Sequence, residues 1–300
     1  MAEGFHEGEL AVQVRAGVAA QAARLGGTML AAPDLNGGIS IFLAERDFAV
    51  LTARGRDGRL WTSPLFASPG FLEARDRTLT IHATPPVGDP LDALAEGQPV
   101  GLLAIEFATR RRVRINGTLT RAAGDGLELL VDQAFGNCPR YIQQRHLEHI
   151  EHPAAGRSER SDELSAEHIA LITRADTFFL GTVHPTRGAD ASHRGGPPGF
   201  VRVDGHRLWW PDYPGNNMFN SLGNIAVDPS TALLFIDFDT GAALHLSGTA
   251  MVDWTTRHIS GDDGGTGRRV CFSIDSIVSG PRLAVRGGIP RPSPHNPPTT

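Results

Sequence analysis

The chain repeats a stretch of its own sequence, and this repetition limits the folds that are open to it. Residues 100–119 align without gaps on residues 231–250, where seven of twenty positions are identical at a constant offset of 131. An upstream match follows at an offset of 129, where Pro69-Gly70-Phe71 falls on Pro198-Gly199-Phe200. A pattern that occurs twice in the same order predicts two copies of one structural unit within the 300 residues.

Each copy has the sequence character of a β-sheet. Short runs of apolar and β-branched residues, such as 48–53 and 177–183, alternate with turn residues. The chain has 35 glycines and 21 prolines, well above the roughly one residue in eight that is usual for the two together. Many turns between short strands are therefore expected. We predict a mainly β protein with flanking helices, built as two tandem six-stranded barrels.

Domain boundaries follow from composition along the chain. An alanine-rich helix is expected over 9–25, ending at Gly26-Gly27, and two short helices are expected within 127–150, separated by Gly136 and Pro139. The predicted parts are an N-terminal helical extension (1–40), a first barrel with C-terminal helices (41–150), a linker (151–165), a second barrel (166–286) and a disordered, proline-rich tail (287–300).

Composition excludes several functional classes. All 28 basic residues are arginine, so the lysine required by Walker-type phosphate loops, pyridoxal phosphate enzymes and protein kinases is missing. A net charge of −5 argues against general attraction to nucleic acid. The chain has no apolar run long enough for a membrane span and an acidic N-terminus, which predict a cytoplasmic protein. A GxGxxG fingerprint is absent, so no resident NAD domain is expected.

Two sequence blocks carry a resemblance to a known family. Residues 209–224 (WWPDYPGNNMFNSLGN) and 135–141 (FGNCPRY) resemble the FMN-binding split-barrel superfamily of pyridoxamine 5′-phosphate oxidase-like proteins, in its tandem bacterial flavin-nucleotide-binding type. The resemblance covers roughly residues 42–278. It implies two split β-barrels, FMN as cofactor, and a flavin-dependent oxidoreductase that acts on a small molecule, with a separate reductase or electron donor as a further partner.

The resemblance also implies where the flavin phosphate is held, and both elements lie in the second copy. One is the end of a strand, and the other is a loop with the start of a helix, where backbone N–H groups favour an anion. Family members carry Ser-Arg-Lys in this loop, and this chain has Asn-Asn-Met. The residues implied in cofactor binding are Ser192, His193, Arg194, Asp212, Tyr213, Asn216, Asn217, Asn220 and Ser221.

The first copy has the complementary features. Its loop 84–90 is poor in donors, and its hairpin carries four arginines between 110 and 114 where the second copy has glycine, alanine and histidine. By resemblance, Arg112 and Arg114 reach the flavin from the opposite barrel. We therefore expect one FMN per chain, held between the copies of a monomeric pseudo-dimer or of a homodimer.

Other interpretations remain open at this stage. The protein could be a non-catalytic FMN or haem carrier, or a scaffold without cofactor. The arginine hairpin could be a solvated face, Trp209 and Trp210 could be core residues, and the asparagines could serve only as turn formers and caps. A helix end is preferred over a metal site for His146, His149 and His152, and an apolar role is preferred over a redox role for Cys138. We predict no metal site and name no catalytic residue.

Overall fold

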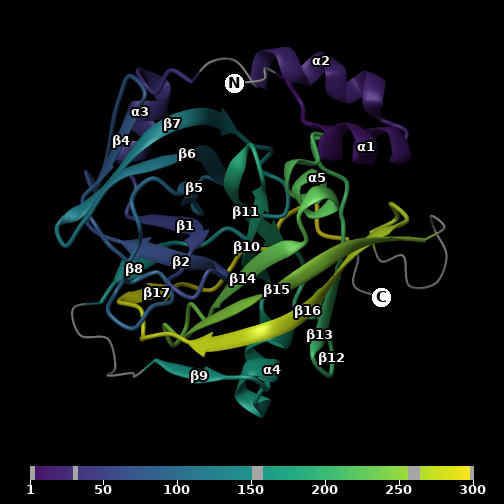
Figure 1. Cartoon of the computed structure of the whole chain (residues 1–300). Coiled ribbons are helices and arrows are strands. Elements are labelled where there is room, and N and C mark those ends of the chain that lie inside the picture. The colour runs from purple at the N-terminus through teal and green to yellow at the C-terminus, as the bar shows by residue number, and fades with distance from the viewer. Residues whose placement is uncertain (1–3, 30–32, 151–157, 256–263, 298–300) are drawn as a thin grey trace.

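The core of the molecule is two antiparallel β-sheets (Figure 1). The computed structural model describes residues 4–29, 33–150, 158–255 and 264–297. The first sheet has the order β2-β1-β5-β6-β7-β4-β3. Its strands are β1 (Phe48–Arg54), β2 (Leu60–Phe66), β3 (Leu72–Arg75), β4 (Thr78–Ile81), β5 (Pro99–Glu106), β6 (Arg111–Ala123) and β7 (Gly126–Gly136).

The second sheet has eight strands in the order β11-β10-β14-β15-β16-β13-β12, with β9 paired to β16 outside this path. Strand for strand, its path follows the same order as the first sheet, with β10 in the place of β1. The strands are β9 (Glu159–Ser161), β10 (Thr177–His184), β11 (Gly188–Gly195), β12 (Arg202–Asp204), β13 (Arg207–Pro211), β14 (Ser230–Ile236), β15 (Ala243–Trp254) and β16 (Arg268–Ser279).

The mainly β prediction is confirmed, but the predicted closed six-stranded barrels are not seen. The sheets have seven and eight strands, and within the described ranges neither pairs its two edge strands. Each long central pairing is interrupted by a register shift, at Asn116/Gly117 in the first sheet and at Ser247/Gly248 in the second. A Cβ at Gly248 would lie 2.0 Å from the Ser273 carbonyl oxygen. These bulges bend the long strands without bringing the sheet edges together.

The two helices predicted within 127–150 are wrong. Residues 127–136 belong to β7, where Leu127, Leu129 and Val131 are buried against the first core. Residues 147–149 form β8 (Leu147–His149), which pairs with β17 (Val285–Gly287). Alternate apolar positions next to a long partner strand favour a strand over a helix, because every second side chain then reaches the core.

The N-terminal helix is also divided differently from the prediction. Instead of one helix over 9–25, the chain forms α1 (Glu7–Arg15) and α2 (Ala19–Met29), separated at Gly17, whose φ is +73°. A residue in this left-handed region ends α1, and only glycine adopts it without strain. Helix α2 continues through Gly26-Gly27, where the prediction placed its end. In Figure 1, α1 lies beside α5 (Asn220–Val227), and the two helices are in contact.

The predicted linker and tail are partly ordered. Residues 151–157 lie outside the described part, but 159–161 form β9, and Ser165 caps α4 (Ala166–Arg174). The prediction of a disordered tail is wrong for residues 287–297: Arg291 exchanges two backbone hydrogen bonds with Gln144, and Ser293 is buried. Residues 298–300 lie outside the described ranges.

The two sheets pack on each other through a third core. The first sheet contributes Phe48 and Leu103, and the second contributes Phe179 and Leu234, all fully buried. The rings of Phe48 and Phe179 meet edge to face at 5.5 Å. Burying side chains of this size stabilises the interface by about 1.5–3 kcal/mol each. Helix α3 (Gly38–Ala44) packs against β3. Within the described residues, no helix is both long enough and apolar enough to cross a membrane.

Candidate functional site

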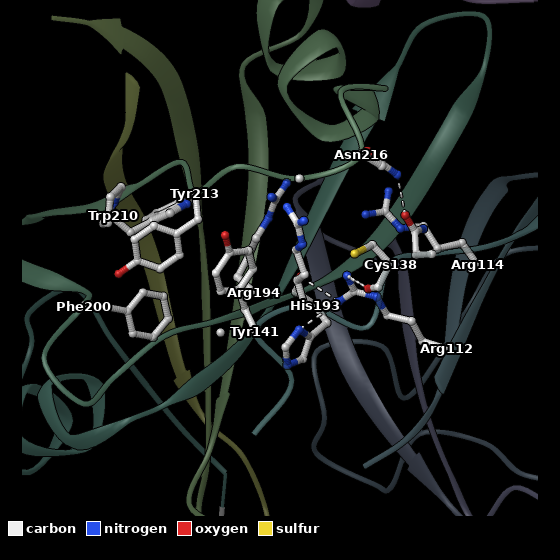
Figure 2. Close-up of a pocket in the computed structure, with 15 residues that line it drawn as sticks. Arg112, Arg114, Cys138, Tyr141, His193, Arg194, Phe200, Trp210, Tyr213 and Asn216 are labelled. Atoms are coloured by element: carbon white, nitrogen blue, oxygen red, sulfur yellow. Dashed lines mark hydrogen bonds between the residues drawn. The ribbon is translucent and has the colours of Figure 1, made fainter. Parts of the chain in front are cut away.

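A groove lies between the two sheets where β6 of the first faces β11 of the second. It encloses about 630 Å³, including its open mouth. The segment after β7 and the segment after β13 close its sides. In Figure 2, Phe200, Trp210 and Tyr213 lie on one side, Arg112, Arg114 and Cys138 on the other, and Arg194 and Tyr141 between them. The lining residues include four arginines (Arg112, Arg114, Arg140 and Arg194) and four aromatic residues (Tyr141, Phe200, Trp210 and Tyr213).

Arg112 is half-buried in this wall and has no acidic partner among the described residues. Its Nη1 donates to Nδ1 of His193 at 2.9 Å, and its Nη2 donates to the Cys138 carbonyl at 2.8 Å. Burial and the neighbouring Arg114 and Arg194 lower the pKa of Arg112 to about 9. Burial and Arg112 hold the pKa of His193 well below its usual range, so this histidine is neutral. Because these positive charges lie close together, the groove favours the binding of an anion.

Two of the other three lining arginines, Arg114 and Arg194, have acidic neighbours. Nη1 of Arg114 lies 3.0 Å from Oδ2 of Asp190, and both side chains are almost fully buried. Arg194 lies 3.9 Å from Asp212, but Asp212 is also bound by Nε of Arg268 at 2.9 Å. Arg114 is therefore neutralised, whereas Arg194 shares its carboxylate with a second guanidinium.

Several buried donors of the groove have no acceptor in the described part of the chain. They are Nε of Arg112, Arg114 and Arg194, Nδ2 of Asn137 and Nε2 of His193. His193 accepts from Arg112 at Nδ1, so its Nε2 carries the proton. Buried donors without partners are costly, and here five of them gather around one groove. This donor set suits a ligand rich in acceptors, such as a phosphate.

A smaller pocket continues the groove toward the first turn of α5. The two hollows share Arg114, Arg194, Tyr213 and Asn216. Helix α5 starts after Phe219, whose φ is +61°. The first-turn N–H groups of a helix have no partner within it and attract negative charge. Asn216 links the start of α5 to the segment that follows β7 of the first sheet, because its Nδ2 donates to Oδ1 of Asn137 at 2.9 Å.

The structure brings together most of the residues implied by the resemblance. Arg112, Arg114, His193, Arg194, Tyr213 and Asn216 line the main groove, and Asp212, Asn217, Asn220 and Ser221 line the pocket at α5. The arginine hairpin of one half thus meets the asparagine loop of the other. Arg110 and Arg111 point elsewhere: Arg110 donates to the Ile142 carbonyl, and Arg111 stacks on Phe42.

Some of these side chains already have protein partners. Ser192 is fully buried, with its Oγ 3.2 Å from Oγ of Ser221. Asn217 donates to Gln21 of α2 at 3.2 Å, and Asn220 donates to Glu9 of α1 at 2.5 Å. The side chains of Ser192, Asn217 and Asn220 therefore stabilise the pocket, and they have less hydrogen-bonding capacity left for a ligand than Asn216 or Arg194.

Nine lining residues were not assigned from the sequence: Asn137, Cys138, Arg140, Tyr141, Gly195, Phe200, Trp210, Pro211 and Gly215. The signal available was the 135–141 block, which carried the resemblance without a role for its members. The core role considered for Trp210 is correct, since it is 2% exposed, and its ring edge also reaches the groove. Cys138 is a free thiol of intermediate exposure in the groove wall.

The histidines considered for metal binding do not form a helix end, because 147–149 is strand β8; His152 lies outside the described part. A different group, His6, Glu7 and His184, places three ligand atoms within 4.8 Å of one another. Nδ1 of each histidine accepts backbone N–H groups, from Gly8 in one case and from Thr186 and Arg187 in the other. Each Nε2 therefore carries a proton and faces an acceptor, which suits a cap and not a metal ligand.

Comparison with known proteins supports one family. Residues 164–256 match the family model of pyridoxamine 5′-phosphate oxidase. No curated protein matches the chain significantly.

Solved structures similar to the chain include three bacterial proteins. One is a candidate pyridoxamine 5′-phosphate oxidase from Lactobacillus delbrueckii, with 17% sequence identity over 39% of this chain and 94% of that one and a TM-score of 0.33. The second is a Clostridium acetobutylicum protein of the pyridoxinephosphate oxidase family related to general stress protein 26, with 16% identity over 41% of this chain and 91% of that one and a TM-score of 0.29. The third is a FAD-binding protein from Mesorhizobium loti, with 9% identity over 44% of this chain and 99% of that one and a TM-score of 0.27. Similarity at this level assigns no ligand or activity to this chain. The family match confirms the resemblance drawn from the sequence: the second half of the chain is similar to the pyridoxamine 5′-phosphate oxidase family.

Proposed function

We propose that the groove between the two sheets binds one FMN per chain and that the protein is a flavin-dependent oxidoreductase for a small molecule. The observation that carries the proposal is the set of buried, unpartnered donors around Arg112 and Arg194. A phosphate accepts several hydrogen bonds at once and neutralises charge that these guanidinium groups cannot lose. The family match over residues 164–256 supports the same reading.

The chain's own residues divide into two parts for this ligand. Arg194, Asn216 and the first turn of α5 offer donors for the phosphate, and Arg112 adds charge from the opposite sheet. Tyr213, which stacks on the buried ring of Phe200, offers an apolar face for a flat ring system. FMN, when bound, supplies hydride and electron transfer. A visiting nicotinamide or a separate reductase would supply its electrons, because the sequence has no dinucleotide fingerprint of its own.

The two halves would then act as a pseudo-dimer. The phosphate side comes from the second sheet, and the arginine hairpin comes from the first, so neither half completes the groove alone. One ligand per chain is the expected stoichiometry.

The test is the visible spectrum of the purified chain, followed by mass analysis of whatever it releases on denaturation. Flavin absorbance and FMN at one per chain support the proposal. A Soret band would indicate haem instead, and a colourless protein that takes up no added FMN would indicate a scaffold.

A matched pair of variants locates the ligand. Arg112→Met removes the buried charge at similar volume and should weaken FMN binding at least about tenfold. Arg207→Met, on the exposed face of β13, should change nothing. Equal binding by both variants would move the ligand away from this groove.

A further inference from the structure

We infer that the C-terminal segment 288–297 is a positioning element for the groove: it holds Tyr141 in the backbone conformation that shapes the groove wall. This inference rests on the proposed function, because the ligand it concerns is FMN. The segment follows β17 and is hydrogen-bonded to residues 141–144 through Arg291 and Ser293. Sequence composition suggested disorder here, and its contacts are instead concentrated on this one stretch.

Tyr141 needs external support. Its φ is +65°, a region that a residue with a large side chain rarely adopts and that costs about 1 kcal/mol or more. Its carbonyl oxygen also passes close to β11, since a Cβ added to Gly195 would lie 2.0 Å from it. The conformation therefore persists only if neighbouring groups hold the peptide on both sides.

The C-terminal segment supplies that hold through Ser293 and Gln143. Oγ of Ser293 accepts the Tyr141 N–H at 3.2 Å. Nε2 of Gln143 donates to the Tyr141 carbonyl at 3.0 Å, and Oε1 of Gln143 accepts the Ser293 N–H at 2.8 Å. Asn296 completes the network with two further bonds to the Gln143 amide. Ser293 and Gln143 are 4% and 2% exposed, so these bonds are shielded from water.

Backbone contacts fix the segment in register. Gln144 and Arg291 exchange hydrogen bonds at 2.9 and 2.7 Å. Arg110 of the first hairpin donates to the carbonyls of Ile142, Arg291 and Pro292. Arg110, which does not line the groove, thus connects the C-terminal segment to the segment that contains Tyr141.

The held residue reaches across the groove to the second half of the chain. The Tyr141 hydroxyl donates to the Pro214 carbonyl at 2.9 Å, and its ring lies 5.0 Å from that of Tyr213. Pro214 precedes Asn216 in the loop that leads to α5. Loss of the C-terminal segment should therefore loosen the Tyr141 wall and, through it, the phosphate end.

The experiment compares the full chain with Ser293→Ala and with a chain that ends at Gly287. Hydrogen exchange of residues 137–145 and FMN affinity are measured for each. We expect exchange of the Tyr141 amide to quicken about tenfold and FMN binding to weaken about tenfold in Ser293→Ala, with larger changes in the shortened chain. Ser68→Ala, an exposed serine between β2 and β3, is the control and should change neither.

The two readouts separate the alternatives. Unchanged exchange, or unchanged FMN affinity, in both variants overturns the inference while leaving the proposed function standing. Faster exchange throughout the molecule, including β5, overturns it as well, because the segment would then act only on global stability. If the full chain takes up no FMN, the proposed function fails, and the inference falls with it.

Discussion

The two sheets share one strand order, yet the contact of β11 with β6 (the open side) forms a cationic groove, whereas at the corresponding contact of β2 with β15 (the closed side) the equivalent side chains are buried. Strand register makes the positions comparable: Leu180 pairs with Ser192 as Leu51 pairs with Ser63, and Leu103 pairs with Arg114 as Leu234 pairs with His245. By that register, the groove residues His193, Arg194, Arg112 and Arg114 correspond to Pro64, Leu65, Ala243 and His245.

On the closed side, the protein's own groups fill the equivalent positions. Leu65 and Ala243 are buried, and His245 lies 3.7 Å from the carboxylate of Asp89, which also binds Ser63. Desolvation raises the pKa of Asp89, so this carboxyl is a poorly hydrated internal acid. Four of the groove positions are thus occupied on the closed side by buried side chains, on the same strand order. The shared strand order therefore does not by itself determine whether a groove forms.

The largest effect is expected at Gly195 on the open side, which corresponds to Phe66 on the closed side. Gly195→Ala would place a Cβ 2.0 Å from the Tyr141 carbonyl oxygen, so the backbone there would have to shift. We expect a loss of unfolding free energy of about 3 kcal/mol. Urea denaturation measures it. Gly124→Ala, which has open space around its Cβ, should be close to neutral, and a similar stability for both variants would contradict the tight passage at Tyr141.

The next effect comes from giving the open side the residue of the closed side. Arg194→Leu should weaken FMN binding about a hundredfold, near 2.7 kcal/mol, through the lost phosphate donor. Stability should not fall, because Arg194 is only half-buried, its Nε has no partner among the described residues, and Asp212 keeps its bond to Arg268. Fluorescence titration and thermal melting give the two numbers, with Arg207→Leu as the exposed control. Undiminished affinity would remove Arg194 from the phosphate site.

A third effect concerns α1, which packs against α5 on the open side of the molecule. Burial raises the pKa of Glu9 to about 7 and lowers that of His6 to about 4. Glu9 therefore costs stability as pH rises from about 4.5 to 7, and His6 costs stability as pH falls from about 6.5 to 4. In the native chain the two slopes oppose each other.

Glu9→Gln should expose the histidine slope alone. Unfolding free energy should then rise by on the order of 2 kcal/mol between pH 4 and 6.5. Denaturation at a series of pH values tests this, with the exposed Glu163→Gln as control. A flat profile for Glu9→Gln would contradict the lowered pKa of His6.

The smallest effect separates two neighbouring asparagines. Asn217 points to Gln21 and has a φ of +61°, which glycine adopts freely, so Asn217→Gly should change FMN affinity less than about threefold. Asn216→Ala should cost about tenfold, since it lines both hollows and holds Asn137. Isothermal titration of both variants decides, and a reversed order would reassign the phosphate loop.

Much of the plan could be read from residues 100–119 and 231–250, because identical apolar spacing demands equivalent strands. The pairing of an arginine hairpin with an asparagine loop could be anticipated for the same reason, since each was visible as a difference between the copies. The helices expected within 127–150 could not be corrected locally. Leu127, Leu129 and Val131 become a strand only because β6 lies alongside to pair with them.

The sequence by itself determined the β character, the repeated strand pattern and the residue types able to meet an anion, because these depend on local periodicity and side-chain chemistry. Only the tertiary structure decided that the sheets stay open, that the C-terminal segment is hydrogen-bonded to Tyr141, and that one sheet contact forms a groove while the equivalent side chains at the other are buried. Those outcomes depend on which distant groups come within hydrogen-bonding distance. No local pattern encodes such distances.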